Sequence, residues 1–142
     1  KGVQISTFGG NPVTATAAKA VIDFIDENNL RVNAAETGAY LRSKLEELQE
    51  KHPIIGDVRG MGLMQAIELV EDRESKKPAT AASLALLEAA RENGILIGKG
   101  GMYGNVVRIT PPLNISKTDV DEFARLLDRS LAAATQPATA NA

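Results

Sequence analysis

Two segments with a strand pattern flank the turn sequence Gly60-Met61-Gly62, one over 54–60 and the other over 63–70. The second segment alternates two sets of side chains, with Leu63, Gln65, Ile67 and Leu69 on one face and Met64, Ala66, Glu68 and Val70 on the other. The glycines of the turn favour a tight hairpin or a bulge. We therefore predict two antiparallel strands joined at this turn.

Two further strands are predicted over 95–98 and 106–109. The prolines of Thr110-Pro111-Pro112 end the second of these, because proline supplies no amide hydrogen to a strand ladder. Alternation places Arg108 on the face opposite to Val107 and Ile109. Arginine has a planar fork of donors that suits a carboxylate, so Arg108 is a candidate carboxylate-binding residue; an ordinary cross-strand ion pair is the alternative.

Arg59, in the first strand pattern, leaves two roles open. Its guanidinium could be a buried ion-pair partner of Asp57 or Glu68, or it could serve at the surface.

Apolar residues recur at helical spacing in four stretches, over 13–28, 32–51, 81–93 and 117–131. Asn11, Thr80 and Ser116 precede three of these stretches and are typical N-cap residues. Gly94 follows the third stretch, as a left-handed helix stop does. The elements together predict an α+β fold: a small, mostly antiparallel sheet of three or four strands with helices packed on one face, preceded by a long connecting helix.

Composition excludes several classes of function. The 142 residues suffice for one compact unit, and the 16 basic and 18 acidic residues are well mixed, so we predict no nucleic-acid partner. The chain has no cysteine and one histidine, so we predict no metal site. No stretch is apolar enough to span a bilayer and the first residues do not resemble a signal peptide, so we predict no membrane partner and a cytoplasmic location.

The segment Ser6-Thr7-Phe8-Gly9-Gly10-Asn11-Pro12 places two hydroxyls and two glycines before a helix. Helix amides and the positive end of the helix dipole attract anions, and glycines allow close approach to the backbone. This loop could bind an anion, although the same pattern is also typical of a plain turn. A second glycine-rich loop, over 99–104, lacks the order of a phosphate-binding P-loop, and we predict that it borders a substrate pocket.

Three ordered motifs resemble the carboxyl-terminal part of class III aminotransferases, of the alanine–glyoxylate type. They are Ser6-Thr7-Phe8-Gly9-Gly10-Asn11-Pro12, Gly56-Asp57-Val58-Arg59-Gly60-Met61-Gly62-Leu63-Met64 and Val107-Arg108-Ile109-Thr110-Pro111-Pro112-Leu113. These motifs cover almost the whole chain and about the final third of such an enzyme.

The resemblance implies transamination with pyridoxal 5'-phosphate between an amino acid and a keto acid. It implies that Thr7, with Ser6, binds the cofactor phosphate, and that this threonine reaches the cofactor of the other subunit of a homodimer. It also implies that Arg108 holds the substrate carboxylate and that Tyr103 lines the mouth of the pocket.

The resemblance also divides the chain. Residues 1–30 would be the end of a large-domain motif and the connecting helix, 31–134 the carboxyl-terminal small domain, and 135–142 a frayed tail. The lysine that forms the Schiff base in this family is expected upstream of the first motif, and Lys1 is not that lysine. We therefore expect a fragment of a longer enzyme, with no catalytic residue of its own and no activity alone.

Two alternatives stay open. One is another pyridoxal-phosphate enzyme of the same fold, namely a decarboxylase, racemase or aminomutase. The other is a stand-alone interaction domain without catalysis, which would be stable and monodisperse without a partner chain.

Overall fold

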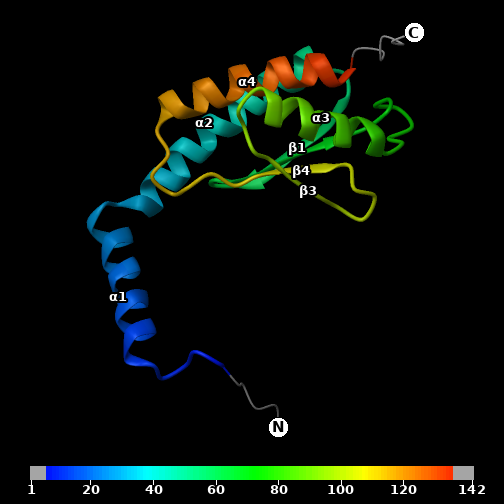
Figure 1. The fold of residues 1–142 in the computed structure, drawn as a ribbon. Coiled ribbons are helices and arrows are strands. Elements are labelled where there is room, and N and C mark those ends of the chain that lie inside the picture. Colours follow the sequence, from blue (N-terminus) through cyan, green and yellow to red (C-terminus); the bar gives the residue numbers. More distant parts are fainter. Residues whose placement is uncertain (1–5, 136–142) are drawn as a thin grey trace.

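The computed structural model describes residues 6–135, which form four helices and four strands (Figure 1). The helices are α1 (Pro12–Glu27), α2 (Leu30–Lys51), α3 (Thr80–Glu92) and α4 (Lys117–Thr135). The strands are β1 (Ile55–Met61), β2 (Met64–Leu69), β3 (Gly98–Gly100) and β4 (Val106–Ile109). They pair antiparallel in the order β1-β2-β4-β3, so β2 and β4 are central. The predicted α+β fold with a small antiparallel sheet is confirmed.

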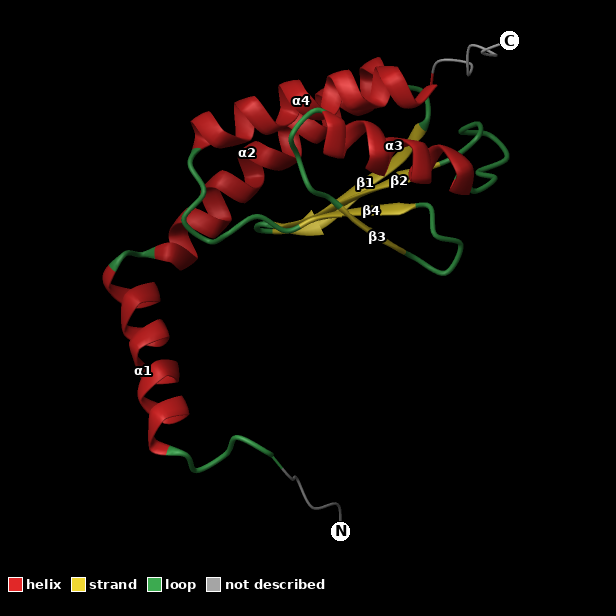
Figure 2. Ribbon diagram, viewed as in Figure 1, coloured by secondary structure: helices red, strands yellow, loops and turns green. Residues whose placement is uncertain are grey.

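Helices α2, α3 and α4 lie on one face of this sheet (Figure 2). Helix α2 contacts β1 and β2, α3 contacts β2 and β3, and α4 packs on α2 and α3. Apolar side chains from every layer fill the space between them, among them Leu41, Leu45, Ile55, Ile67, Leu86, Val107 and Leu127. No helix within residues 6–135 covers the other face, which we call the open face (Figure 2). None of the helices in this part of the chain is both long and apolar enough to cross a membrane.

The hairpin between β1 and β2 meets α2 backbone against backbone. Gly62, in the turn, has φ 54°, a left-handed value that glycine adopts without strain. A Cβ atom at Gly38 of α2 would lie 2.2 Å from the carbonyl carbon of Gly62. The two glycines therefore set the distance between the helix and the hairpin.

The predicted strand over 95–98 is wrong in its position, since β3 covers Gly98–Gly100. The amide of Ile95 donates instead to the carbonyl of Ala90, and Gly94 turns the chain with φ 87°. These features end α3 and use the amide that a strand would need. Gly94 as the helix stop is confirmed.

The predicted cap at Thr80 is also wrong. Ala79 is the N-cap of α3, and its amide donates to the carbonyl of Leu69 in β2. Thr80 is the first helical residue, and its hydroxyl donates to the carbonyl of Tyr103 at 2.6 Å. The threonine thus fastens a loop instead of capping its own helix.

Helix α1 extends away from the rest of the described chain (Figure 1) and has no buried residue. Asn11 caps it, with its side chain accepting from the amide of Val13, as predicted. Asn29, with φ 52°, separates α1 from α2. Val13 and Phe24 are 75% and 54% exposed, so the apolar stripe of this helix has no cover within residues 6–135.

Helix α4 has a capped start and continues to Thr135. Ser116 and Asp119 exchange hydrogen bonds at its start, which confirms the predicted cap. Thr135, the first residue of the predicted frayed tail, is helical. The other residues of that tail, and Lys1, lie outside the described part of the chain.

Side chains from two other elements fasten the carboxyl end of α2. His52 is the buried C-cap of α2, and its Nε2 lies 2.6 Å from Oδ1 of Asp128 on α4. Lys51 donates to the other oxygen of the same carboxylate. Arg73, in the loop after β2, donates to the carbonyls of Gln49 and His52 at this end and to that of Ile55 at the start of β1. The histidine therefore has a structural role in the geometry of the fold.

The contact between Gly38 and Gly62 gives the first prediction. Gly38→Ala should lower the free energy of unfolding by about 1–3 kcal/mol, because the added methyl overlaps the hairpin backbone. Helix propensity alone would predict the opposite sign, a gain of about 1 kcal/mol. Urea unfolding of the chain measures the change, with exposed Glu36→Ala as the control. A stabilised Gly38→Ala variant would contradict the tight contact.

The carboxylate of Asp128 gives a pH-dependent prediction. Burial opposes its ionisation, but hydrogen bonds from Lys51 and His52 outweigh burial and lower its pKa. Its contribution is therefore present above the unfolded pKa, about 3.9, and is lost as the pH falls through the lower folded pKa.

Asp128→Asn should then lower the free energy of unfolding at neutral pH by about 1.5–3 kcal/mol, and the difference should shrink below about pH 4. Urea unfolding at neutral pH and at a pH below about 4 measures this difference. The control Asp23→Asn removes an exposed ion pair with Lys19 and should change stability by about 0.5 kcal/mol or less. A difference for Asp128→Asn that is the same at both pH values speaks against the assignment.

Candidate functional site

Arg108 lies on the open face of the sheet. Strand β4 buries Val107 and Ile109 in the core and turns Arg108 to the exposed side. Its neighbours in register are Ala66 of β2 and Gly98 of β3, which are small. The predicted orientation of Arg108, opposite to its apolar neighbours, is confirmed.

Arg59 lies on the same face and has two carboxylate partners. Its Nη1 is 2.6 Å from Oδ2 of Asp57 and 2.6 Å from Oε2 of Glu68. The hydrogen bonds to Asp57 and then to Glu68 raise the pKa of Arg59. The predicted ion pair of Arg59 is therefore confirmed, with both carboxylates, but its predicted burial is wrong, since the Arg59 side chain is 47% exposed.

Arg108 differs from Arg59 in this respect. Within residues 6–135 no carboxylate forms an ion pair with Arg108, so the cross-strand alternative does not hold for the described chain. A guanidinium stays charged at physiological pH and holds its donors in a fork. Arg108 is thus a cationic group on an open sheet face, with its donors available to an external anion.

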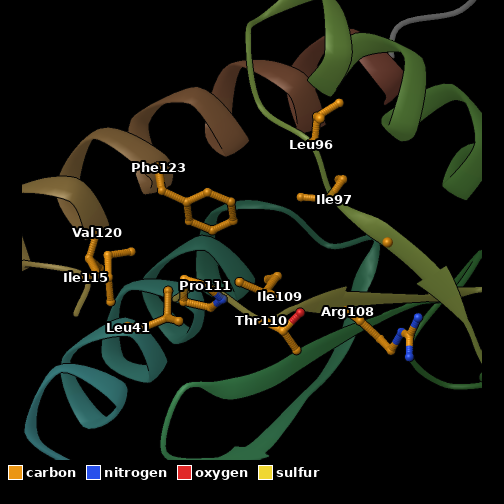
Figure 3. Close-up of a pocket in the computed structure, with 11 residues that line it drawn as sticks. Leu41, Leu96, Ile97, Arg108, Ile109, Thr110, Pro111, Ile115, Val120 and Phe123 are labelled. Carbon is orange, nitrogen blue, oxygen red and sulfur yellow. The ribbon is translucent and has the colours of Figure 1, made fainter. Parts of the chain in front are cut away.

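An apolar cavity of about 160 Å³ lies behind β4, on the helix side of the sheet. Val120 and Phe123 of α4 and Ile109 of β4 line it, and Arg108 borders it. Figure 3 shows the Arg108 guanidinium pointing away from Phe123 and out of the cavity. The cavity and the guanidinium therefore face different sides of the sheet.

Tyr103 lies in the loop between β3 and β4 and is 64% exposed. Thr80 fixes this loop at the carbonyl of Tyr103. The buried amide of Asn105 fixes the other end of the loop by donating to the carbonyl of Leu69 at 2.9 Å. Tyr103 does not line the cavity beside Arg108, and its predicted place at the mouth of a substrate pocket stays a prediction.

The Ser6–Thr7 loop presents exposed hydroxyls before α1. A Cβ at Gly9 would lie 3.2 Å from the hydroxyl oxygen of Ser6, so the missing side chain leaves room for that hydroxyl. A Cβ at Gly10 would meet no atom within 4 Å. Hydroxyl donors beside uncovered glycine backbone are the chemistry that a phosphate needs, so the loop fits that group.

The helix amides contribute less to this loop than predicted. The side chain of Asn11 accepts from the amide of Val13, and Pro12 has no amide hydrogen. Thr14 donates its hydroxyl to the carbonyls of Phe8 and Asn11, which fixes the shape of the loop. The exposed hydroxyls are therefore its principal donors for an anion.

The structure does not bring the loop and Arg108 together. Helix α1 has 16 residues, which corresponds to about 24 Å. It carries the Ser6–Thr7 loop away from the sheet that holds Arg108 (Figure 1). The two candidate sites are separate within the described chain.

Sequence reasoning missed two anchoring residues. Asn105 holds the β3–β4 loop, and its position directly after Gly104 is typical of a turn and hides its burial. Arg73 caps α2, but it lies in a charged segment that resembles a solvated loop. No signal in the sequence distinguishes Arg73 from its charged neighbours.

Comparison with known proteins places these residues in a family. The family model for class-III aminotransferases matches residues 1–131. An Arabidopsis thaliana protein named alanine–glyoxylate aminotransferase 2 homolog 2, mitochondrial, is 53% identical over 89% of this chain and 26% of its own length. An alanine/serine racemase from Pyrococcus horikoshii is 38% identical over 92% of this chain and 27% of its own length.

Solved structures agree. A Bacillus anthracis aminotransferase has a TM-score of 0.84 and 35% identity, over 91% of this chain and 30% of its own. A phospholyase from Arthrobacter, in complex with phosphoethanolamine, has a TM-score of 0.86 and 36% identity, over 94% of this chain and 31% of its own. The chain thus spans between a quarter and a third of the length of these relatives. It belongs to the class III aminotransferases, a family of pyridoxal-phosphate enzymes.

Proposed function

We propose that this chain is the carboxyl-terminal part of an aminotransferase that moves an amino group between an amino acid and a keto acid. The observation that carries the proposal is the contrast on the open face: Arg59 has two carboxylate partners, whereas Arg108 has none among residues 6–135. Both substrate classes carry a carboxylate, which a guanidinium fork binds in a bidentate manner.

In this proposal the chain supplies binding groups. Arg108 orients the substrate by its carboxylate, and each such hydrogen bond contributes about 1.5–3 kcal/mol. Tyr103 lies beside the substrate in the assembled enzyme. Pyridoxal phosphate, when bound, supplies the electron sink for bond changes at the substrate α-carbon. We assign no catalytic residue to residues 1–142 and expect no transfer by the chain alone, because its matched motifs do not include the Schiff-base lysine.

We further propose that Thr7, with Ser6, donates to the cofactor phosphate of the other subunit in a homodimer. The length of α1 supports this, because it keeps the Ser6–Thr7 loop away from the sheet that presents Arg108. The exposed apolar side chains of α1 also call for a covering surface.

The domain limits at residues 30 and 134 are part of the same proposal. So is the cytoplasmic location, although the name of the Arabidopsis relative describes that protein as mitochondrial.

Racemisation is the second candidate, and the names of two relatives favour it. These are the alanine/serine racemase and a leucine/methionine racemase from Thermococcus litoralis, 41% identical. A carboxylate-binding Arg108 serves either reaction, so only an assay separates them. L-alanine incubated with the intact protein and glyoxylate should give pyruvate and glycine in an aminotransferase, and D-alanine without an acceptor in a racemase. If the protein forms neither set of products, the result favours a non-catalytic interaction domain.

Arg108→Lys keeps the charge and removes the fork. In the intact protein it should raise KM for a carboxylate-bearing substrate about tenfold, as expected for one lost charge-assisted hydrogen bond. Turnover of an amine without a carboxylate should stay the same. Arg59→Lys, on the same face, is the matched control and should leave both values unchanged. An unchanged KM in Arg108→Lys would refute the carboxylate role.

Thr7→Val removes the hydroxyl and keeps the shape of the side chain. In the intact protein it should weaken retention of pyridoxal phosphate by about tenfold or more, because a donor to a charged group is lost. Equilibrium dialysis followed by cofactor absorbance measures the dissociation constant. Thr7→Ser retains the hydroxyl and should bind like the natural protein. Equal constants for Thr7→Val and the natural protein would leave Thr7 a plain loop residue.

A further inference from the structure

Strand β3 has the sequence Gly98-Lys99-Gly100, with both glycines on the same face. Glycine is depleted in strands because it loses entropy and packs no side chain. Neither Gly98 nor Gly100 has a positive φ, so the backbone does not require glycine here. The two glycines are then explained by what occupies the space beside the strand on their face.

The Arg108 side chain occupies that space. A Cβ at Gly100 would lie 3.6 Å from both Cδ and Nε of Arg108, and one at Gly98 would lie 3.8 Å from Nη2. Gly98 also pairs directly with Arg108 in the ladder. The arginine therefore lies along β3, with its aliphatic part against Gly100 and its guanidinium against Gly98.

We propose that Gly98 and Gly100 are specificity-determining positions. Because neither has a side chain, the two residues leave a flat surface, which we call the seat. The Arg108 side chain lies on this seat at the sheet edge, with its guanidinium open to a substrate carboxylate. The proposal rests on the carboxylate role of Arg108 proposed above. A single methyl at either position would make ordinary contact with the arginine. A branched side chain would need the volume that the arginine fills and would displace the guanidinium.

Lys99 supplies the matched control. It alternates to the other face of β3, where a Cβ at Gly104 would meet its Nζ at 3.6 Å. Lys99→Val introduces the same branched residue into the same strand without entering the seat.

The test uses the intact, cofactor-loaded protein and the series Gly100→Ala and Gly100→Val. Gly100→Val should raise KM for a carboxylate-bearing substrate about tenfold, while Gly100→Ala and Lys99→Val stay within about twofold of the natural protein. All variants should process an amine without a carboxylate equally well. Calorimetric titration with propionate, which cannot react, should show the same order of dissociation constants. If the effect came instead from the narrower range of backbone conformations open to any residue other than glycine, KM would already rise in Gly100→Ala.

The outcomes separate the two proposals when Arg108→Ala is measured beside them. If Arg108→Ala weakens propionate binding and Gly100→Val does not, the seat is wrong and the carboxylate role stands. If neither weakens it, both proposals are overturned. Equal loss for both substrates in Gly100→Val, or a loss already complete in Gly100→Ala, also overturns the seat. If Gly100→Val does not fold, Arg108→Ala in the same chain should restore folding, and failure to restore it counts against the shared space.

Discussion

The burial of one face of the four-stranded sheet is the constraint on which the other features depend. Ile67 and Val107 are fully buried on the central strands, so the core fixes which way each strand faces. Side chains alternate strictly along a strand, and a shift of one residue would exchange the two faces. The helix layer therefore determines, from a distance, that Arg108 faces outward.

Charge on the open face is arranged unevenly, and this carries functional information. Arg59 forms an ion pair with Glu68 across the β1–β2 pair and a second one with Asp57 of its own strand, so two carboxylates engage its guanidinium. Arg108, on the next strand, has Ala66 and Gly98 as its neighbours in register, and neither can accept a hydrogen bond through its side chain. An arginine kept among small neutral residues retains its attraction for an external carboxylate.

Local patterns predicted the elements whose causes are local. The β1–β2 hairpin, the Asn11 cap and the orientation of Arg108 follow from alternation and capping within a few residues. The turn itself is Gly62-Leu63 and not Gly60-Met61-Gly62 as predicted, because Gly60 and Met61 still pair with β2. The errors came from contacts distant in sequence. Thr80 bonds to a loop 23 residues away, and no local pattern shows that a threonine will be used in this way. The sequence also left open which carboxylate, if any, each of Arg59 and Arg108 pairs with, because it does not give the register of separate strands.

The two proposed binding roles fall on parts of the described chain that lie apart in a single copy. In the proposed roles the Ser6–Thr7 loop would donate to a phosphate and Arg108 would bind a carboxylate, but α1 holds the two apart. The same helix exposes Val13, Val21 and Phe24, whose burial against another surface would be favourable. Both needs have one physical solution, because a surface that covers α1 also lies next to the loop that α1 carries. Covering the apolar stripe and delivering the hydroxyls to a phosphate would then be a single event.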